Sequence, residues 1–120
     1  MRPVISESVM KILKPLLHKF KSPDVKLLGQ ELSKAKIVKD NELKKNVVSL
    51  NSIVEFFDNS INKPIRMQIV LPEEADLKKR KVSILAPISI ALIGFKESYS
   101  FLWQMPSGLK QLKIIKVINE

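Results

Sequence analysis

The stretch PEEADLKKRKVSILAPISIALIG, residues 72–94, reverses its charge and then becomes almost wholly apolar. Three carboxylates at its start are followed by four consecutive basic residues, 78–81. Residues 82–85 then have the composition of a strand. Residues 87–93 predict a short buried helix, because proline suits the first helical position and Gly94 is the usual left-handed residue after a helix. This stretch therefore predicts one strand followed by one short helix.

Four more strands are predicted around this stretch. Two precede it, at residues 47–57 and 64–71, and two follow it, at residues 99–105 and 110–118. In the last strand the inward-facing set shifts phase between Ile114 and Ile115, which predicts a bulge or a strand buried on both faces. Five antiparallel strands and one short helix predict an α+β domain.

The N-terminal part predicts two helices packed as a short antiparallel hairpin. Residues 6–20 carry an apolar stripe on one face, and Pro15 within it predicts a kink or a restart of the helix. Ser22 can cap a second helix beginning at Pro23, whose apolar positions step like a coiled-coil seam. Neither face is wide enough to form a core alone, so we expect an arm whose root packs on the next domain. The predicted parts are residues 1–46 and residues 47–120.

The composition limits the class of protein. An apolar fraction of 45% is ordinary for a globular core, whereas 28% charged residues argue against a membrane protein. The chain has no cysteine, which excludes a disulfide framework and a thiolate metal site. Its start lacks the apolar segment of a signal peptide, so we expect a soluble cytoplasmic protein.

The net charge of +9 favours polyanions or acidic protein surfaces as partners. Only Arg2, Arg66 and Arg80 are arginines, which argues against sequence-specific DNA reading, since arginine is preferred for base contacts. A general nucleic-acid binder with a lysine-rich surface stays an alternative, and its binding would be weak, insensitive to sequence and salt-dependent. A continuous basic face on the first 50 residues would favour this alternative, whereas interrupting acidic residues would indicate a solvated surface.

Several segments resemble the Gre (GreA/GreB) transcription elongation factors, whose C-terminal domain is FKBP-like. Residues 48–54, 74–76, 82–87 and 91–94 resemble that domain in order and spacing. Residues 28–35 and 101–108 resemble Rnk, the regulator of nucleoside diphosphate kinase, a short-armed homologue that looks the nearest relative. An influence on that kinase is implied by the family name alone, and no residue suggests a mechanism for it.

The resemblance implies a regulator of transcription elongation that binds RNA polymerase beside its secondary channel. It also implies that the docking surface contains Glu73, Glu74, Asp76, Ser83 and Pro87. For the three carboxylates the alternative is a solvated turn. Pro87 would begin a helix whatever the function.

The tip of the hairpin argues against a role in catalysis. Gre factors carry an acidic pair at the tip of a long coiled coil, which helps to hold a catalytic metal inside the polymerase. Here the tip has Lys19, Lys21 and one carboxylate, Asp24, which also suits the start of a helix. About fifteen helical residues reach only roughly 22 Å. We therefore expect a non-catalytic protein that does not stimulate transcript cleavage.

Other ligands and activities have little support in the sequence. We expect no cofactor, no bound metal, no small-molecule substrate and no membrane partner. His18 is the only histidine and lies beside the apolar stripe of the first helix. A prolyl isomerase would need an open aromatic pocket, and the alternating aromatic positions of the sheet argue that most of these rings are core.

Overall fold

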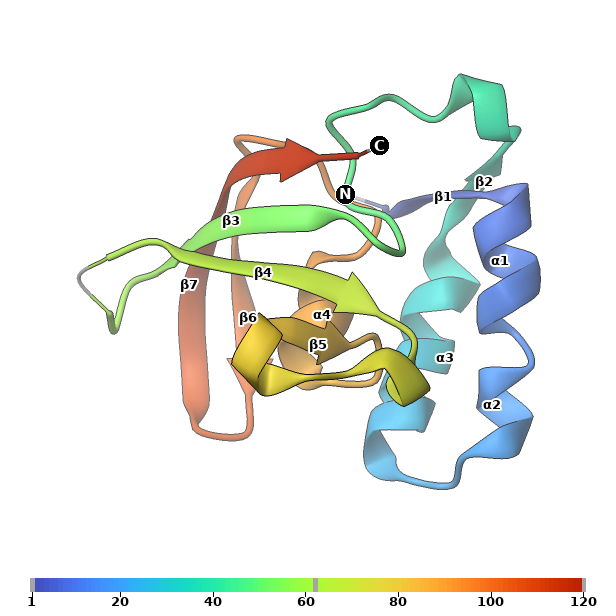
Figure 1. The fold of residues 1–120 in the computed structure, drawn as a ribbon, viewed down its shortest axis with the longest axis horizontal. Helices are drawn as coiled ribbons and strands as arrows, with labels where there is room; N and C mark the ends of the chain where they lie inside the picture. Colours follow the sequence, from blue (N-terminus) through green and yellow to red (C-terminus); the bar gives the residue numbers. More distant parts are fainter. Residues whose placement is uncertain (1, 62, 120) are drawn as a thin grey trace.

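A curved five-stranded sheet and a helical hairpin lie side by side in the computed structural model, which describes residues 2–61 and 63–119 (Figure 1). The predicted ends at Met1 and Glu120 lie outside these described residues. The strands follow the spatial order β5-β4-β3-β7-β6. They are β3 (Ile53–Asp58), β4 (Ile65–Val70), β5 (Lys81–Ser83), β6 (Ser100–Met105) and β7 (Gly108–Ile118). The α+β class is as predicted.

The sheet is mixed, so the prediction of a wholly antiparallel sheet was wrong. β3 runs antiparallel to β4 and β7, and β6 runs antiparallel to β7, but β5 runs parallel to β4. Residues 71–80 separate β4 from β5 and form two 3-10 turns, η2 (Pro72–Glu74) and η3 (Leu77–Lys79). A tight hairpin turn would have made β5 antiparallel to β4, whereas this longer connection returns the chain to Gln68, in the second half of β4, before β5 begins.

The predicted bulge is present in β7. Glu55 of β3 faces Lys116, and the next residue, Phe56, faces Ile114, so Ile115 has no partner on β3. One extra residue on one strand is the definition of a β-bulge. The bulge explains the phase shift of the apolar residues in the sequence.

The short helix α4 (Pro87–Leu92) covers the inner face of the sheet (Figure 1). Pro87 occupies its first turn, and Gly94 after it has φ +87°, as predicted. Ile84, Ile90 and Leu92 are fully buried. The apolar half of residues 72–94 therefore belongs to the hydrophobic core, whereas most of its charged half is exposed.

The strand predicted over residues 47–57 begins later than expected, at Ile53. Val47 and Val48 pair instead with the segment after α4. The amide of Gly94 donates to the Val48 carbonyl and the Val48 amide donates to the Phe95 carbonyl, both at 2.8 Å. The apolar composition of residues 47–50 thus reflects core packing, not membership of the sheet.

Three helices form the hairpin: α1 (Glu7–Leu13), α2 (Leu16–Lys19) and α3 (Pro23–Lys34). The helix is interrupted at Pro15, between the end of α1 and the start of α2, which confirms the predicted restart. The Ser22 hydroxyl accepts a hydrogen bond from the Val25 amide at 3.3 Å, which confirms the predicted cap of α3.

A second, unpredicted sheet lies at the open end of the hairpin, and it contacts the segment after α4 because the Val4 amide donates to the Gly94 carbonyl at 2.8 Å. β1 (Val4–Ser6) and β2 (Lys36–Val38) pair in parallel at the open end of the hairpin. Apolar residues of α1, α2 and α3 also belong to the same hydrophobic cluster as those of the five-stranded sheet. The hairpin therefore shares one hydrophobic core with the sheet domain, whereas we expected an arm packed only at its root. The domain boundary between residues 46 and 47 stays a prediction.

Candidate docking site

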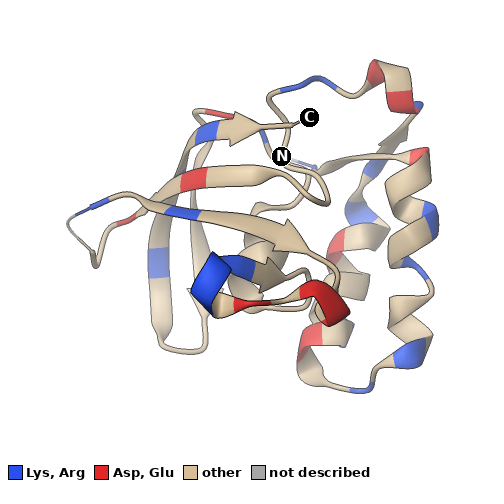
Figure 2. Ribbon diagram, in the orientation of Figure 1, with Lys and Arg blue, Asp and Glu red and all other residues tan. Residues whose placement is uncertain are grey.

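The charge reversal of residues 73–81 folds into two 3-10 turns that pack against β5. Glu73 and Glu74 are exposed in η2, and Lys78 and Lys79 are exposed in η3. Figure 2 shows the acidic turn and the basic turn as neighbouring red and blue segments beside β5. Opposite charges therefore lie at the two ends of one edge of the sheet.

Asp76 has a structural role between the two turns. Its carboxylate accepts a hydrogen bond from the Lys78 amide at 3.1 Å, which caps η3. Its backbone exchanges two hydrogen bonds with Lys81, both at 2.9 Å. Arg80 ends the turn in the left-handed region, with φ +55°. The solvated-turn alternative thus fits Glu73 and Glu74 better than it fits Asp76.

Ser83 and Pro87 are half-buried and also have local roles. The Ser83 hydroxyl accepts a hydrogen bond from the Leu85 amide at 3.0 Å, and its carbonyl accepts one from the Ala86 amide at 3.0 Å. Because side chains alternate along a strand, Ser83 faces away from the side on which Val82 lies. The predicted residues therefore surround β5 but do not all share one face.

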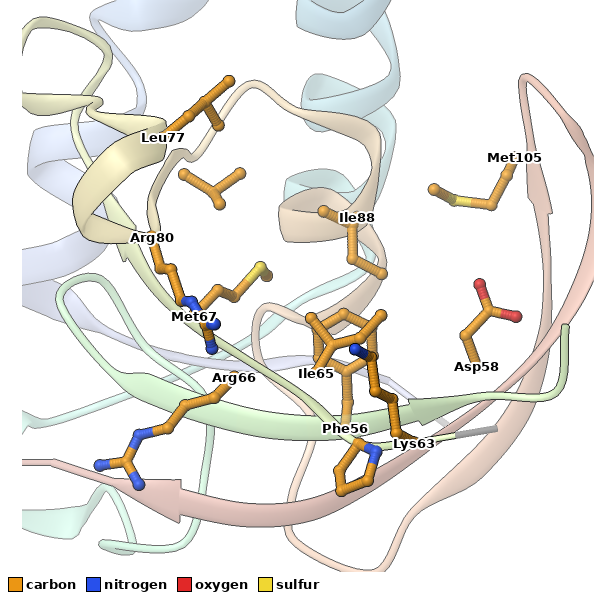
Figure 3. Close-up of a pocket in the computed structure, with 12 residues that line it drawn as sticks. Phe56, Asp58, Lys63, Ile65, Arg66, Met67, Leu77, Arg80, Ile88 and Met105 are labelled. Carbon is orange, nitrogen blue, oxygen red and sulfur yellow. The ribbon is translucent and has the colours of Figure 1, made fainter. Parts of the chain in front are cut away.

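A groove of about 470 Å³ opens beside β5, on the inner side of the sheet. Phe56 and Met67 form its buried floor, at 3% and 4% exposure. Figure 3 shows Phe56, Ile65 and Ile88 together at the centre, with Leu77 and Met105 on opposite sides. The remaining lining residues are Asp58, Lys63, Pro64, Arg66, Arg80 and Val82.

Leu77 is the most exposed of the large apolar residues described, at 82%. It lies in η3, at the mouth of the groove, between the cap Asp76 and the basic residue Lys78. A single leucine among charged residues in a turn is a signal in the sequence for such a site, and Leu77 was not among the predicted residues. Exposed apolar surface next to a groove is typical of a protein-interaction site.

The charged rim of the groove is mainly basic. Lys63, Arg66 and Arg80 contribute three cations, and Asp58 contributes one carboxylate. Hydrogen bonds from the Ser60 amide (2.9 Å) and hydroxyl (2.8 Å) lower the pKa of Asp58, and nearby Lys110 lowers it further. The apolar floor suits an apolar side chain of a partner, and the three cations of the rim suit acidic residues next to that side chain.

The residues of the hairpin tip lie apart from this groove. Lys19 ends α2, Lys21 lies in the link, and Asp24 lies in the first turn of α3. None of the three lines the groove. In the part of the chain that the structure describes, no group of three or more His, Cys, Asp or Glu residues could hold a metal ion.

In Figure 2 red segments lie on α3 and near the open end of the hairpin, whereas blue segments follow one another along α1, α2 and the link to α3. Lys34 forms an ion pair with Glu31 at 3.2 Å. Hydrogen bonds from Ser8, and to a smaller extent the charge of Lys11, lower the pKa of Asp40. Acidic residues therefore interrupt the basic surface at Lys34 and near Lys11 but not along the rest of α1 and α2, and the nucleic-acid alternative stays a prediction.

Across residues 2–61 and 63–119, no helix has the length and apolar character needed to cross a membrane.

The proteins similar in sequence to this chain belong to one family. The family model "Transcription elongation factor, GreA/GreB, C-term" matches residues 43–119. The chain is 33% identical over 93 residues to transcription elongation factor GreA of Pelobacter propionicus, covering 78% of this chain and 59% of that protein. It is 33% identical over 86 residues to GreA of Caldanaerobacter subterraneus, covering 72% and 55% respectively. The chain thus matches little more than half the length of these relatives.

A solved structure, "Prokaryotic transcription elongation factor GreA/GreB from Nitrosomonas europaea", matches with a TM-score of 0.80 and 30% identity, covering 99% of both chains. Gfh1 of Thermus aquaticus matches with a TM-score of 0.54 and 17% identity, which shows likeness of fold alone. The predicted nearness to Rnk stays a prediction. Because the family model covers most of the chain, from residue 43 to residue 119, the chain belongs to the GreA/GreB family of transcription elongation factors through its C-terminal domain.

Proposed function

We propose that this chain binds RNA polymerase near its secondary channel and regulates elongation without stimulating transcript cleavage. The match of residues 43–119 to the GreA/GreB C-terminal domain carries the proposal. The likeness to the Nitrosomonas europaea structure extends this support over the hairpin, since it covers 99% of both chains. As a family member that binds polymerase, the chain would act as a regulator and not as an enzyme in its own right.

We place the docking surface on the β5 side of the sheet. The acidic turn with Glu73 and Glu74, the start of α4 at Pro87 and the mouth of the groove at Leu77 all belong to residues 72–88. Leu77 is an exposed apolar anchor, and interface energy usually concentrates in a few such side chains. Asp76 and Ser83 would support this surface mainly by holding η3 and the turn after β5 in shape.

Three features of the hairpin support a role without cleavage. The twelve residues of α3 extend only about 18 Å. The hairpin also packs into the common hydrophobic cluster, so its tip cannot extend far from the sheet domain. At that tip, Asp24 is the single carboxylate in the first turn of α3, where it suits the helix dipole.

Adding the protein to a backtracked polymerase complex is therefore expected to leave the rate of transcript cleavage unchanged. Gel analysis of the labelled RNA measures that rate, and a cleavage-stimulating Gre factor serves as the positive control. Binding of the protein to the same complex must be verified by co-sedimentation. An acceleration that is abolished by Asp24→Asn would contradict the proposal for the tip while leaving polymerase binding intact.

A further inference from the structure

The edge strand β6 lacks the features that usually prevent edge strands from pairing. It lies at the end of the sheet, and among the strands of residues 2–61 and 63–119 only β7 pairs with it. No charged residue occurs from position 98 to position 109, although 28% of the chain is charged. β6 has no proline and pairs with β7 in unbroken register. Natural proteins normally protect an edge with charges, prolines or bulges.

The hydrogen-bond phase of β6 follows from one contact at its start. The Ile114 amide donates to the Tyr99 carbonyl at 2.9 Å, and an antiparallel ladder repeats every second residue. The backbone groups of Phe101, Trp103 and Met105 therefore face β7. Those of Ser100, Leu102 and Gln104 point to the open edge.

We propose that two copies of this chain pair through β6, antiparallel, around a two-fold axis at Leu102. In this register Leu102 lies opposite Leu102 of the second copy, and Ser100 lies opposite Gln104. The outward-facing backbone groups of all three residues then find partners, because each such pair exchanges two hydrogen bonds. The two sheets would join into one continuous ten-stranded sheet.

The side chains of β6 are self-complementary in this register. On the outer face, Leu102 is 60% exposed and would meet its own copy. On the inner face, Phe101 and Trp103 are half-buried, with ring centroids 6.3 Å apart in an edge-to-face arrangement. Phe101 would lie opposite Trp103 of the second copy, and such cross-strand aromatic pairs stabilise sheets.

The charge distribution also selects this edge for a second copy. Each chain carries a net charge of +9, so two copies repel each other wherever lysines meet. The uncharged stretch 98–109 allows close approach without burying an unpaired charge. The apolar stretch 82–95 is equally free of charge, but it includes the buried helix α4 and cannot serve.

Sedimentation velocity of the full chain over a range of concentrations tests the proposal. We expect a monomer–dimer equilibrium that shifts toward the dimer when salt is raised, because screening weakens the repulsion. Leu102→Lys places like charges opposite each other and should raise the dissociation constant at least about tenfold. Leu109→Lys is the matched control, since Leu109 is equally exposed, at 61%, but lies on β7. A monomer at all concentrations, or equal loss in both variants, would overturn the proposal.

A single cysteine tests the register independently, because the chain has none of its own. Residues that directly oppose each other in a hydrogen-bonded pair have Cα atoms about 5.5 Å apart, within the range of a disulfide. Leu102→Cys should therefore form a covalent dimer under mild oxidation, and Leu109→Cys should not. Equal cross-linking of the two variants would exclude the register. Neither result depends on whether the chain binds polymerase.

Discussion

Replacing Gly94 with alanine is expected to lower the free energy of unfolding by roughly 2–5 kcal/mol. Gly94 has φ +87°, a conformation that alanine adopts only with strain. An added Cβ would lie 2.5 Å from the Pro3 Cβ and 2.9 Å from the Val4 nitrogen. The backbone of β1 would have to move, although the Val4 amide donates to the Gly94 carbonyl at 2.8 Å. Urea unfolding measures the loss.

Gly108→Ala is the matched control for this variant. Gly108 also has positive φ, at +126°, but no atom lies within 4 Å of its added Cβ. Its variant should show backbone strain without the steric clash and therefore a clearly smaller loss. Equal losses in the two variants would contradict the close contact between β1 and residue 94. A single unfolding transition in both would support joint unfolding of the hairpin and the sheet domain.

Leu77→Asp is expected to weaken binding to core RNA polymerase by about 10-fold to 100-fold. Complete burial of a leucine side chain contributes about 1.5–3 kcal/mol, and 1.4 kcal/mol corresponds to a factor of ten. Because Leu77 is largely exposed in the free chain, its replacement should leave the fold intact. Surface-immobilised polymerase gives the dissociation constants, and circular dichroism checks the fold.

Charge reversal at the acidic turn, Glu73→Lys with Glu74→Lys, should weaken the same binding several-fold. Both glutamates are exposed, which makes them cleaner probes than Asp76 or Ser83, whose side chains hold η3 and the turn after β5. Lys113→Glu is the control, since Lys113 is exposed on β7 and does not line the groove. Wild-type affinity in the Leu77 and glutamate variants would mean that the docking surface lies elsewhere.

Local chemistry explains why much of the fold was predictable. Pro15 removes a backbone donor, Ser22 caps the helix that follows, and the apolar phase shift at Ile115 marks the bulge. Each of these signals acts within a few residues of the structure that it predicts. They therefore required no knowledge of the distant parts of the chain.

The features that were missed depend on contacts between distant segments. β1 pairs with β2 across about 30 residues, and its three residues are too few to distinguish a strand from the start of the apolar stripe of the first helix. The direction of β5 depends on how residues 71–80 fold back, which composition does not specify. The groove combines residues of β3, β4, β5, β6 and α4, so only Leu77, an isolated apolar residue among charges, could have indicated it.

Competition with a Gre factor for core RNA polymerase tests the central proposal most directly. Labelled Gre factor is bound to core polymerase, and the full chain is added at increasing concentration while fluorescence anisotropy reports release. We expect complete displacement by the wild-type chain and displacement by Leu77→Asp only at about tenfold or higher concentration. Retention of the Gre factor at every concentration of the wild-type chain would contradict the proposal that this protein docks on polymerase through the family site.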